Sequence, residues 1–141
     1  MVKTGWLLYE TGDLALNRDF AEHVAREGRK RDLDIQTVRT AELALGIKNG
    51  GGLLLRRNGR ETLPDFVLSR QRDALVSEQF EKLGVPVFNG SRVCDVCNDK
   101  RKTHQFLAGV PMLETAFVDH RRAVAPPEER YPLVVKPACG H

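Results

Sequence analysis

Apolar and polar residues near the start of the chain follow a pattern that predicts a strand, a helix and a second strand. Residues 5–9 form a short apolar run typical of a buried strand, and Asp13 is expected to cap the helix that follows. One face of that helix carries the apolar residues Leu16, Phe20, Ala21, Val24 and Ala25. Residues 33–37 alternate with a period of two, which predicts the second strand. A βαβ unit of this kind implies parallel strands joined by a right-handed crossover.

The next segment is predicted to contain a hairpin, a buried strand, a helix and one more strand. A glycine-rich break precedes a hairpin that turns at Asn58 and Gly59. Residues 66–68 are the buried strand, and residues 74–83 form a helix that a glycine closes. A short strand at residues 85–88 follows. The inward face of the helix is expected to consist of Leu75, Val76, Phe80 and Leu83.

The second half of the chain has a different pattern. Two short helices are predicted at residues 91–97 and 99–108. Residues 113–118 and 131–136 have the composition of strands, and the second of these strands ends at Lys136. This change in pattern predicts two domains.

The fold class expected from these elements is α/β. Residues 1–93 are interpreted as a Rossmann-like three-layer domain with a parallel sheet, and residues 94–141 as part of a second domain. A chain of 141 residues is long enough for one ordinary domain, or for a small domain and a piece of another.

Composition and charge exclude several functional classes. Hydrophobic residues make up 41% of the chain and charged residues 29%, which is typical of soluble globular proteins. A net charge of +3 is too small to indicate a nucleic-acid partner. No apolar stretch approaches the ~20 residues of a membrane span, and no secretory signal is recognisable. The three cysteines fit reduced thiols better than a disulfide framework, so a cytoplasmic location is predicted.

Three cationic side chains are placed where an α/β fold binds anions. Lys136 lies between a predicted strand and a loop, where an ammonium group pairs with phosphate while loop amides surround the oxygens. Lys100 opens a helix whose expected N-cap is Asp99. The helix dipole disfavours a cation in this first turn, so the placement of Lys100 hints at a role other than stabilising the helix. Arg70 follows a buried strand and is placed to meet a carboxylate or phosphate. The alternative for each residue is an ordinary solvated cation.

A lone CxxC motif raises the question of a metal or redox site. Zinc could be held by Cys94 and Cys97 with Cys139, His104 or His141, but a structural zinc site normally has a second pair at recognisable spacing. A redox pair would follow a strand at the start of a helix. Both cysteines of the motif lie on a predicted helix instead, so buried or incidental thiols are favoured, and the roles of the three cysteines stay open.

Several segments, taken in order, resemble one known family. They are residues 64–70, 79–91, 98–111 and 132–137. Their order and spacing are similar to the N-terminal part of an ATP-grasp ligase, and most similar to the RimK-like glutamate ligases. The resemblance extends from about residue 63 to residue 140. It implies that residues 1–93 are a pre-ATP-grasp domain and that residues 94–141 begin an ATP-grasp domain.

The resemblance implies an ATP-dependent carboxylate–amine ligase. Such an enzyme phosphorylates a carboxylate with ATP, and an amine of an amino acid, peptide or protein then attacks the acyl phosphate. Lys100 and Lys136 match the family's two nucleotide-contacting lysines, and the loop after Lys136 matches the start of its glycine-rich flap. Arg70 is assigned to the carboxylate substrate.

The same resemblance implies that the site is incomplete within this sequence. The catalytic residues and the ligands of Mg²⁺ are expected beyond residue 141, so the chain is expected to be an N-terminal part that is inactive alone. The alternative is a non-catalytic interaction or dimerisation module, because an unpaired strand at residues 133–135 would be a sticky edge that favours a homo-oligomer.

Overall fold

The computed structural model of the protein describes residues 1–119 and 132–139. The chain divides into two compact units, Met1–Asp95 and Val96–His141, which are described separately. The boundary falls inside a helix, close to the predicted division between residues 93 and 94; the interpretation of the two units as functional domains stays a prediction. None of the helices in the described ranges is long and apolar enough to cross a membrane.

The first unit contains seven strands, three helices, a short 3₁₀ turn and most of a fourth helix. The strands are β1 (Lys3–Tyr9), β2 (Leu33–Arg39), β3 (Leu43–Ile47), β4 (Leu53–Arg57), β5 (Arg60–Glu61), β6 (Phe66–Ser69) and β7 (Val87–Phe88). The helices are α1 (Thr11–Leu16), α2 (Arg18–Arg29), α3 (Ala74–Lys82) and α4 (Ser91–Cys97), with a 3₁₀ turn at Thr40–Glu42. The second unit contains the end of α4 and the helix α5 (Lys100–Phe106).

A four-stranded parallel sheet with the order β2-β1-β6-β7 forms the centre of the first unit. β1 lies between two neighbours, so that Leu7 is in register with Thr37 of β2 on one side and with Leu68 of β6 on the other. The predicted α/β class, the βαβ unit and the parallel sheet are confirmed.

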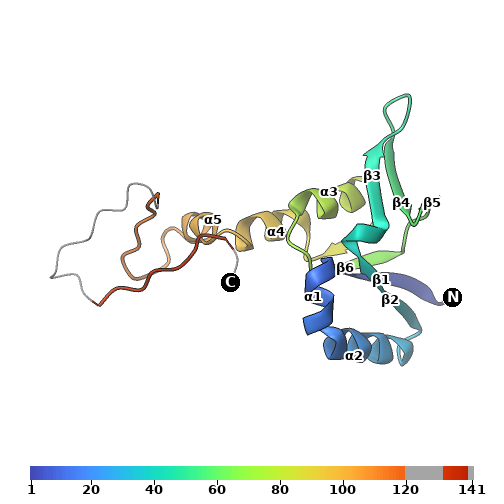
Figure 1. The fold of residues 1–141 in the computed structure, drawn as a ribbon, viewed down its shortest axis with the longest axis horizontal. Helices are drawn as coiled ribbons and strands as arrows, with labels where there is room; N and C mark the ends of the chain where they lie inside the picture. Colours follow the sequence, from blue (N-terminus) through green and yellow to red (C-terminus); the bar gives the residue numbers. More distant parts are fainter. Residues whose placement is uncertain (120–131, 140–141) are drawn as a thin grey trace. The chain divides into compact units, whose positions relative to one another are not determined.

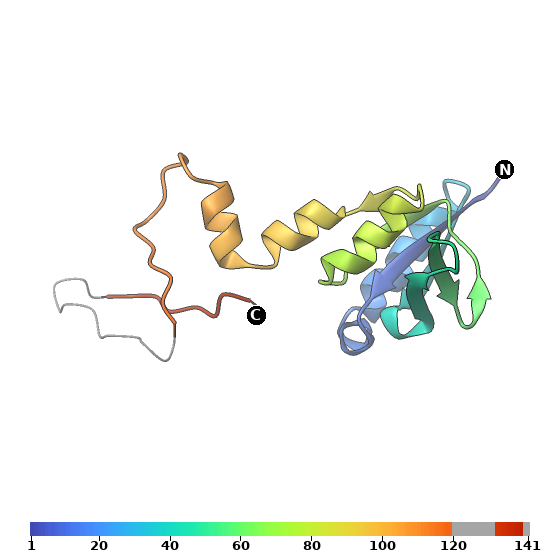
Figure 2. The ribbon, with the colours of Figure 1, turned by 90° about the horizontal axis from the view of Figure 1, so that it is seen from above.

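The apolar residues of β1 alternate between the two faces of this sheet. Trp6 and Leu8 join one core cluster with Phe80 of α3, and the Trp6 and Phe80 rings meet edge to face with centroids 5.9 Å apart. Leu7 and Tyr9 join a second cluster on the side of α1 and α2. Figure 1 shows α1 and α2 on one side of the sheet and α3 on the other, and Figure 2 gives the perpendicular view. The strand is buried on both faces, as expected of a central parallel strand.

A second, antiparallel sheet with the order β3-β4-β5 belongs to the same unit. The predicted hairpin is present, with positive φ at both Asn58 and Gly59, as its tight turn requires. β3, which pairs with β4 along its whole length, was not predicted. The amide of Gln79 on α3 donates to the carbonyls of Gly46 and Leu54, and these hydrogen bonds attach α3 to the small sheet.

Two expectations about the first helical region are wrong. Asp13 does not cap a helix: Glu10 is the N-cap of α1, and Asp13 lies in its first turn, where a carboxylate suits the helix dipole. The helical region breaks at Asn17 into α1 and α2, so the single apolar face predicted across it does not continue. As a result, Leu16 is 87% exposed and Phe20 is 45% exposed.

The predicted inward face of α3 is correct except at one residue. Val76 and Phe80 are buried and Leu83 packs against the core, but Leu75 is 62% exposed. Successive residues on a helix are about 100° apart, so a face centred on Val76 and Phe80 turns Leu75 outward. Gly84 follows the helix with φ +81°, the left-handed conformation expected after a helix end.

The strands predicted in the second half are absent from the described residues. Residues 113–118 and 132–136 have no regular secondary structure, and Val134 and Val135 are 81% and 92% exposed. A strand requires a neighbour that pairs with its backbone groups, and the described residues offer these segments none. The two predicted short helices are confirmed as α4 and α5.

Candidate functional site

The carboxyl ends of β1 and β6 meet at the point where the chain leaves the sheet in opposite directions. From β1 the chain passes through α1 and α2 to β2, and from β6 it passes through α3 to β7 on the other side. Open parallel sheets bind ligands at such a topological switch point. Here it carries Glu10 after β1 and residues 70–73 after β6.

A buried polar network fixes the backbone at this point. Gln71 is 4% exposed, and its side-chain amide donates to the hydroxyls of Ser69 and Ser77, each at 3.1 Å. The side-chain carbonyl of Gln71 accepts a hydrogen bond from the backbone N–H of Asp73. The Cys94 thiol approaches the backbone carbonyl of Gln71 at 3.6 Å. Buried polar groups that are paired in this way give the segment a defined conformation.

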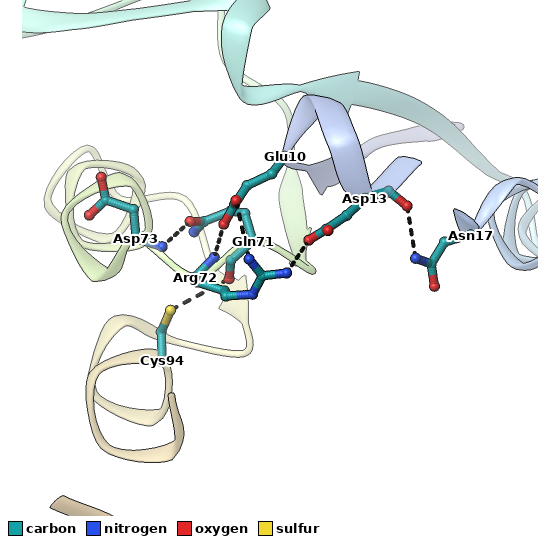
Figure 3. A network of polar contacts seen from close by, with 7 residues as sticks. All are labelled: Glu10, Asp13, Asn17, Gln71, Arg72, Asp73 and Cys94. Carbon is teal, nitrogen blue, oxygen red and sulfur yellow. Dashed lines mark hydrogen bonds and ion pairs between the residues drawn. The ribbon is translucent and has the colours of Figure 1, made fainter. Parts of the chain in front are cut away.

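Arg72 connects the two loops of the switch point through charge. Its backbone N–H donates to the Glu10 carboxylate at 3.0 Å, and its guanidinium lies 3.4 Å from the same carboxylate. The guanidinium also donates to the Asp13 carboxylate at 2.6 Å, and the Asn17 amide donates to the Asp13 carbonyl (Figure 3). Two carboxylates therefore hold one arginine, and α1 is tied to the loop after β6.

Arg70, the residue predicted to bind the substrate, lies at the same end of the sheet. It is exposed, and its backbone N–H donates to the Leu8 carbonyl at 2.8 Å. Its guanidinium lies over the Phe20 ring of α2, 5.1 Å from the centroid, an arrangement that attracts a cation to the ring face. Within residues 1–119 and 132–139 it forms no ion pair with a carboxylate. Its role in substrate binding stays a prediction.

The two predicted nucleotide-binding lysines both belong to the second unit. Lys100 is the first residue of α5, and its backbone N–H donates to the carbonyl of Ala138 at 2.9 Å. An antiparallel bridge pairs Asp99 with Cys139 next to this hydrogen bond. Lys136 is exposed and precedes Ala138 by two residues. The structure thus brings the segment that carries Lys136 against the start of α5, whereas Gly140 of the predicted flap lies outside the described residues.

An ion pair at the start of α5 was not predicted. Asp99 is the N-cap, as expected, and accepts from the backbone N–H of Arg101 at 2.9 Å. The Arg101 guanidinium also binds both carboxylate oxygens of Asp99, with its Nε 3.0 Å from Oδ1. These hydrogen bonds, with the charge of Arg101, hold the pKa of Asp99 well below its usual range, and Asp99 raises the pKa of Arg101 in turn. The sequence could have indicated this ion pair, because an arginine two residues after an N-cap aspartate is close enough to bind its carboxylate.

The cysteines do not form a metal site in the described part of the chain. Cys94 is buried, whereas Cys97 and Cys139 are exposed. Within residues 1–119 and 132–139, no group of three or more histidine, cysteine, aspartate or glutamate side chains is placed to hold a metal ion. His141, one of the zinc ligands considered above, lies outside these residues.

Comparison with known proteins gives a match at the level of structure only. No family model and no curated protein matches the sequence. Among solved structures, the chain is similar to D-alanyl-alanine synthetase A from Vibrio cholerae, an ATP-grasp ligase, with a TM-score of 0.52 and 14% sequence identity. The match covers 76% of this chain and 37% of that one. The chain therefore has a fold found in part of an ATP-grasp ligase, and it spans about 37% of the length of that protein.

The pKa of Asp99 gives a testable prediction. Because its folded-state pKa is depressed, its contribution to stability is complete above the ordinary value of 3.8 and is lost as pH falls through the lower folded-state pKa. We expect the Asp99 carboxyl carbon to titrate below 3.8 by NMR, and Arg101→Gln to raise the midpoint. Lys102→Gln removes a charge from the same helix and should leave the midpoint near that of the unmodified chain. An ordinary midpoint in the unmodified chain would contradict the ion pair.

Proposed function

We propose that this chain contributes the first part of an ATP-dependent carboxylate–amine ligase of the RimK-like kind, with an acyl-phosphate mechanism. The observation that carries the proposal is the fold that the chain shares with part of D-alanyl-alanine synthetase A. The order of the sequence segments that resemble ATP-grasp ligases adds support, because it rests on the sequence and not on the shared fold. The partners proposed are a nucleotide and an amino acid, peptide or protein substrate.

The charges around the start of α5 support the proposal that ATP phosphates bind there. Lys100 is the first residue of α5, and the segment of Lys136 is hydrogen-bonded to the same turn through Ala138. Asp99 is the N-cap carboxylate of this turn, and Arg101 engages it with two hydrogen-bonding nitrogens. Two lysine-bearing segments joined at one helix start suit a triphosphate, because phosphoryl transfer depends mainly on positioning and on neutralising charge.

The described residues do not fit a magnesium site. They contain no group of three or more histidine, cysteine or acidic side chains placed to bind a metal. We propose that the ligands of Mg²⁺ come from residues other than those described, as the resemblance to ATP-grasp ligases implies. Within this chain, we propose that Lys100 and Lys136 bind the nucleotide and that Arg70 contacts the substrate carboxylate.

The ATP-binding role can be tested in the whole protein. We expect Lys136→Ala and Lys100→Ala each to weaken ATP binding roughly tenfold or more, because each removes a charge-assisted contact to phosphate. Lys102→Ala is the matched control: residues two apart lie on nearly opposite faces of a helix, so its loss should have a smaller effect. Isothermal titration calorimetry measures the ATP affinity of all three variants. An unchanged affinity in both Lys136→Ala and Lys100→Ala would refute the assignment.

One observation favours the alternative of an interaction or dimerisation module. The predicted sticky strand at residues 133–135 does not form, but apolar side chains of the second unit are exposed, with Leu113 at 91% and Val118 at 70%. Exposed apolar surface of this kind marks interaction sites. Under this alternative, light scattering coupled to size-exclusion chromatography gives a dimer mass that Leu113→Ser and Val118→Ser together reduce to that of a monomer. A monomer at all concentrations for the unmodified chain would exclude the dimer.

A further inference from the structure

A surface groove of about 540 Å³ lies between α1, α2 and the end of β2 in the first unit, and its lining includes none of the residues assigned to ATP. Its apolar lining consists of Leu14, Ala15, Ala21 and Ala25. The volume lies within the range of small-molecule sites, and the methyl-rich lining leaves room for a compact apolar group.

Hydrogen-bond donors outnumber acceptors in the polar lining. The polar lining residues are Arg18, Arg39, Thr11 and Thr37, with Glu22 as the one carboxylate among them. Arg39 is paired with Glu42 at 3.1 Å, whereas Arg18 forms no ion pair within residues 1–119 and 132–139. The excess of donors suits an anion, and an unpaired guanidinium is the side chain best shaped for a carboxylate.

A buried hydroxyl in the core cluster that adjoins the groove gives an independent observation. Tyr9 is 1% exposed, and its hydroxyl has no hydrogen-bond partner among the residues that the structure describes. Tyr9 belongs to the core cluster on the side of α1 and α2, and Ala21 and Leu14 of that cluster also line the groove. A buried hydroxyl without a partner costs about 1–3 kcal/mol, so a ligand that reached it would recover part of that cost.

The helix α1, which contributes Leu14 to the groove, is held by polar contacts more than by buried side chains. None of the side chains of α1 is buried, and α1 is held through the contacts of Asp13 with Arg72 and Asn17. Leu14 packs against the cluster that contains Tyr9, so access of a ligand to the Tyr9 hydroxyl requires a displacement of α1. Elements with few buried contacts are those that open most readily.

We propose that this groove binds a small organic monocarboxylate with a compact apolar body. Arg18 pairs with the carboxylate, the Tyr9 hydroxyl donates to the same group, and the alanine and leucine side chains enclose the apolar body. Glu22 disfavours a second negative charge, so a monoanion binds better than a dianion. The inference does not depend on the ligase function, because it uses none of the residues assigned to ATP or to Arg70.

The binding test uses 4-methylpentanoate as the probe and the whole chain as the protein. Methyl resonances of Ala15, Ala21 and Ala25 report occupancy during an NMR titration. We expect 4-methylpentanoate to shift these resonances, and both its neutral amide and the dianion 3-methylglutarate to bind roughly tenfold more weakly. If 4-methylpentanoate leaves the alanine resonances unmoved, or if the amide binds as well as the acid, the proposal is overturned.

Variants of the two donors test their separate roles. Arg18→Gln should weaken the binding of 4-methylpentanoate roughly tenfold. Arg29→Gln removes the same charge from the other end of α2 and should leave the affinity for 4-methylpentanoate unchanged. Tyr9→Phe should weaken the binding of 4-methylpentanoate roughly fivefold. It should not lower the unfolding midpoint of the free protein, because the lost hydroxyl had no hydrogen-bond partner among the described residues. Equal affinity in Arg18→Gln and Arg29→Gln overturns the carboxylate site, and an unchanged affinity in Tyr9→Phe overturns the part assigned to Tyr9.

Discussion

The burial of β1 between two parallel neighbours is the constraint on which the first unit depends. Trp6 and Leu8 fill the core on the α3 side of the sheet, while Leu7 and Tyr9 fill the core on the α1 and α2 side. Because β1 pairs in parallel with β6, the carboxyl ends of the two strands meet at one edge of the sheet. The crossovers that follow the two strands part at this point, toward β2 on one side and β7 on the other. The candidate substrate site is therefore a consequence of the packing of this strand.

Polar contacts then give the switch point its shape. The buried side chain of Gln71 binds the loop after β6 to Ser69 and Ser77. On the protein surface, Arg72 binds the same loop to Glu10 and Asp13. The same contacts anchor α1, which contributes Thr11, Leu14 and Ala15 to the lining of the groove. In the second unit, the hydrogen bond between Lys100 and Ala138 has a comparable role, since it attaches the segment of Lys136 to α5. A backbone hydrogen bond and a backbone bridge therefore join the two lysine-bearing segments.

The sequence predicted those features that depend on local pattern. The strand at β1, the turn at Asn58 and the N-cap at Asp99 follow from residue types that favour one backbone conformation. β3 was missed because Leu43–Ile47 alternates weakly and becomes a strand through its pairing with β4. The network around Arg72 was missed for a related reason, because its partner Glu10 is 62 residues away in the sequence. The strand predicted to end at Lys136 does not form in the described residues. Residue composition favours an extended backbone but does not provide the neighbouring strand with which that backbone must pair.

We propose that the protein is part of an enzyme that activates a carboxylate with ATP. The most direct test is ³¹P NMR of the whole protein incubated with ATP, Mg²⁺ and a mixture of the twenty amino acids. The account predicts that ADP and inorganic phosphate appear, and that adding hydroxylamine converts the activated carboxylate to a hydroxamate. The formation of AMP and pyrophosphate, or the absence of any ATP consumption, would contradict it.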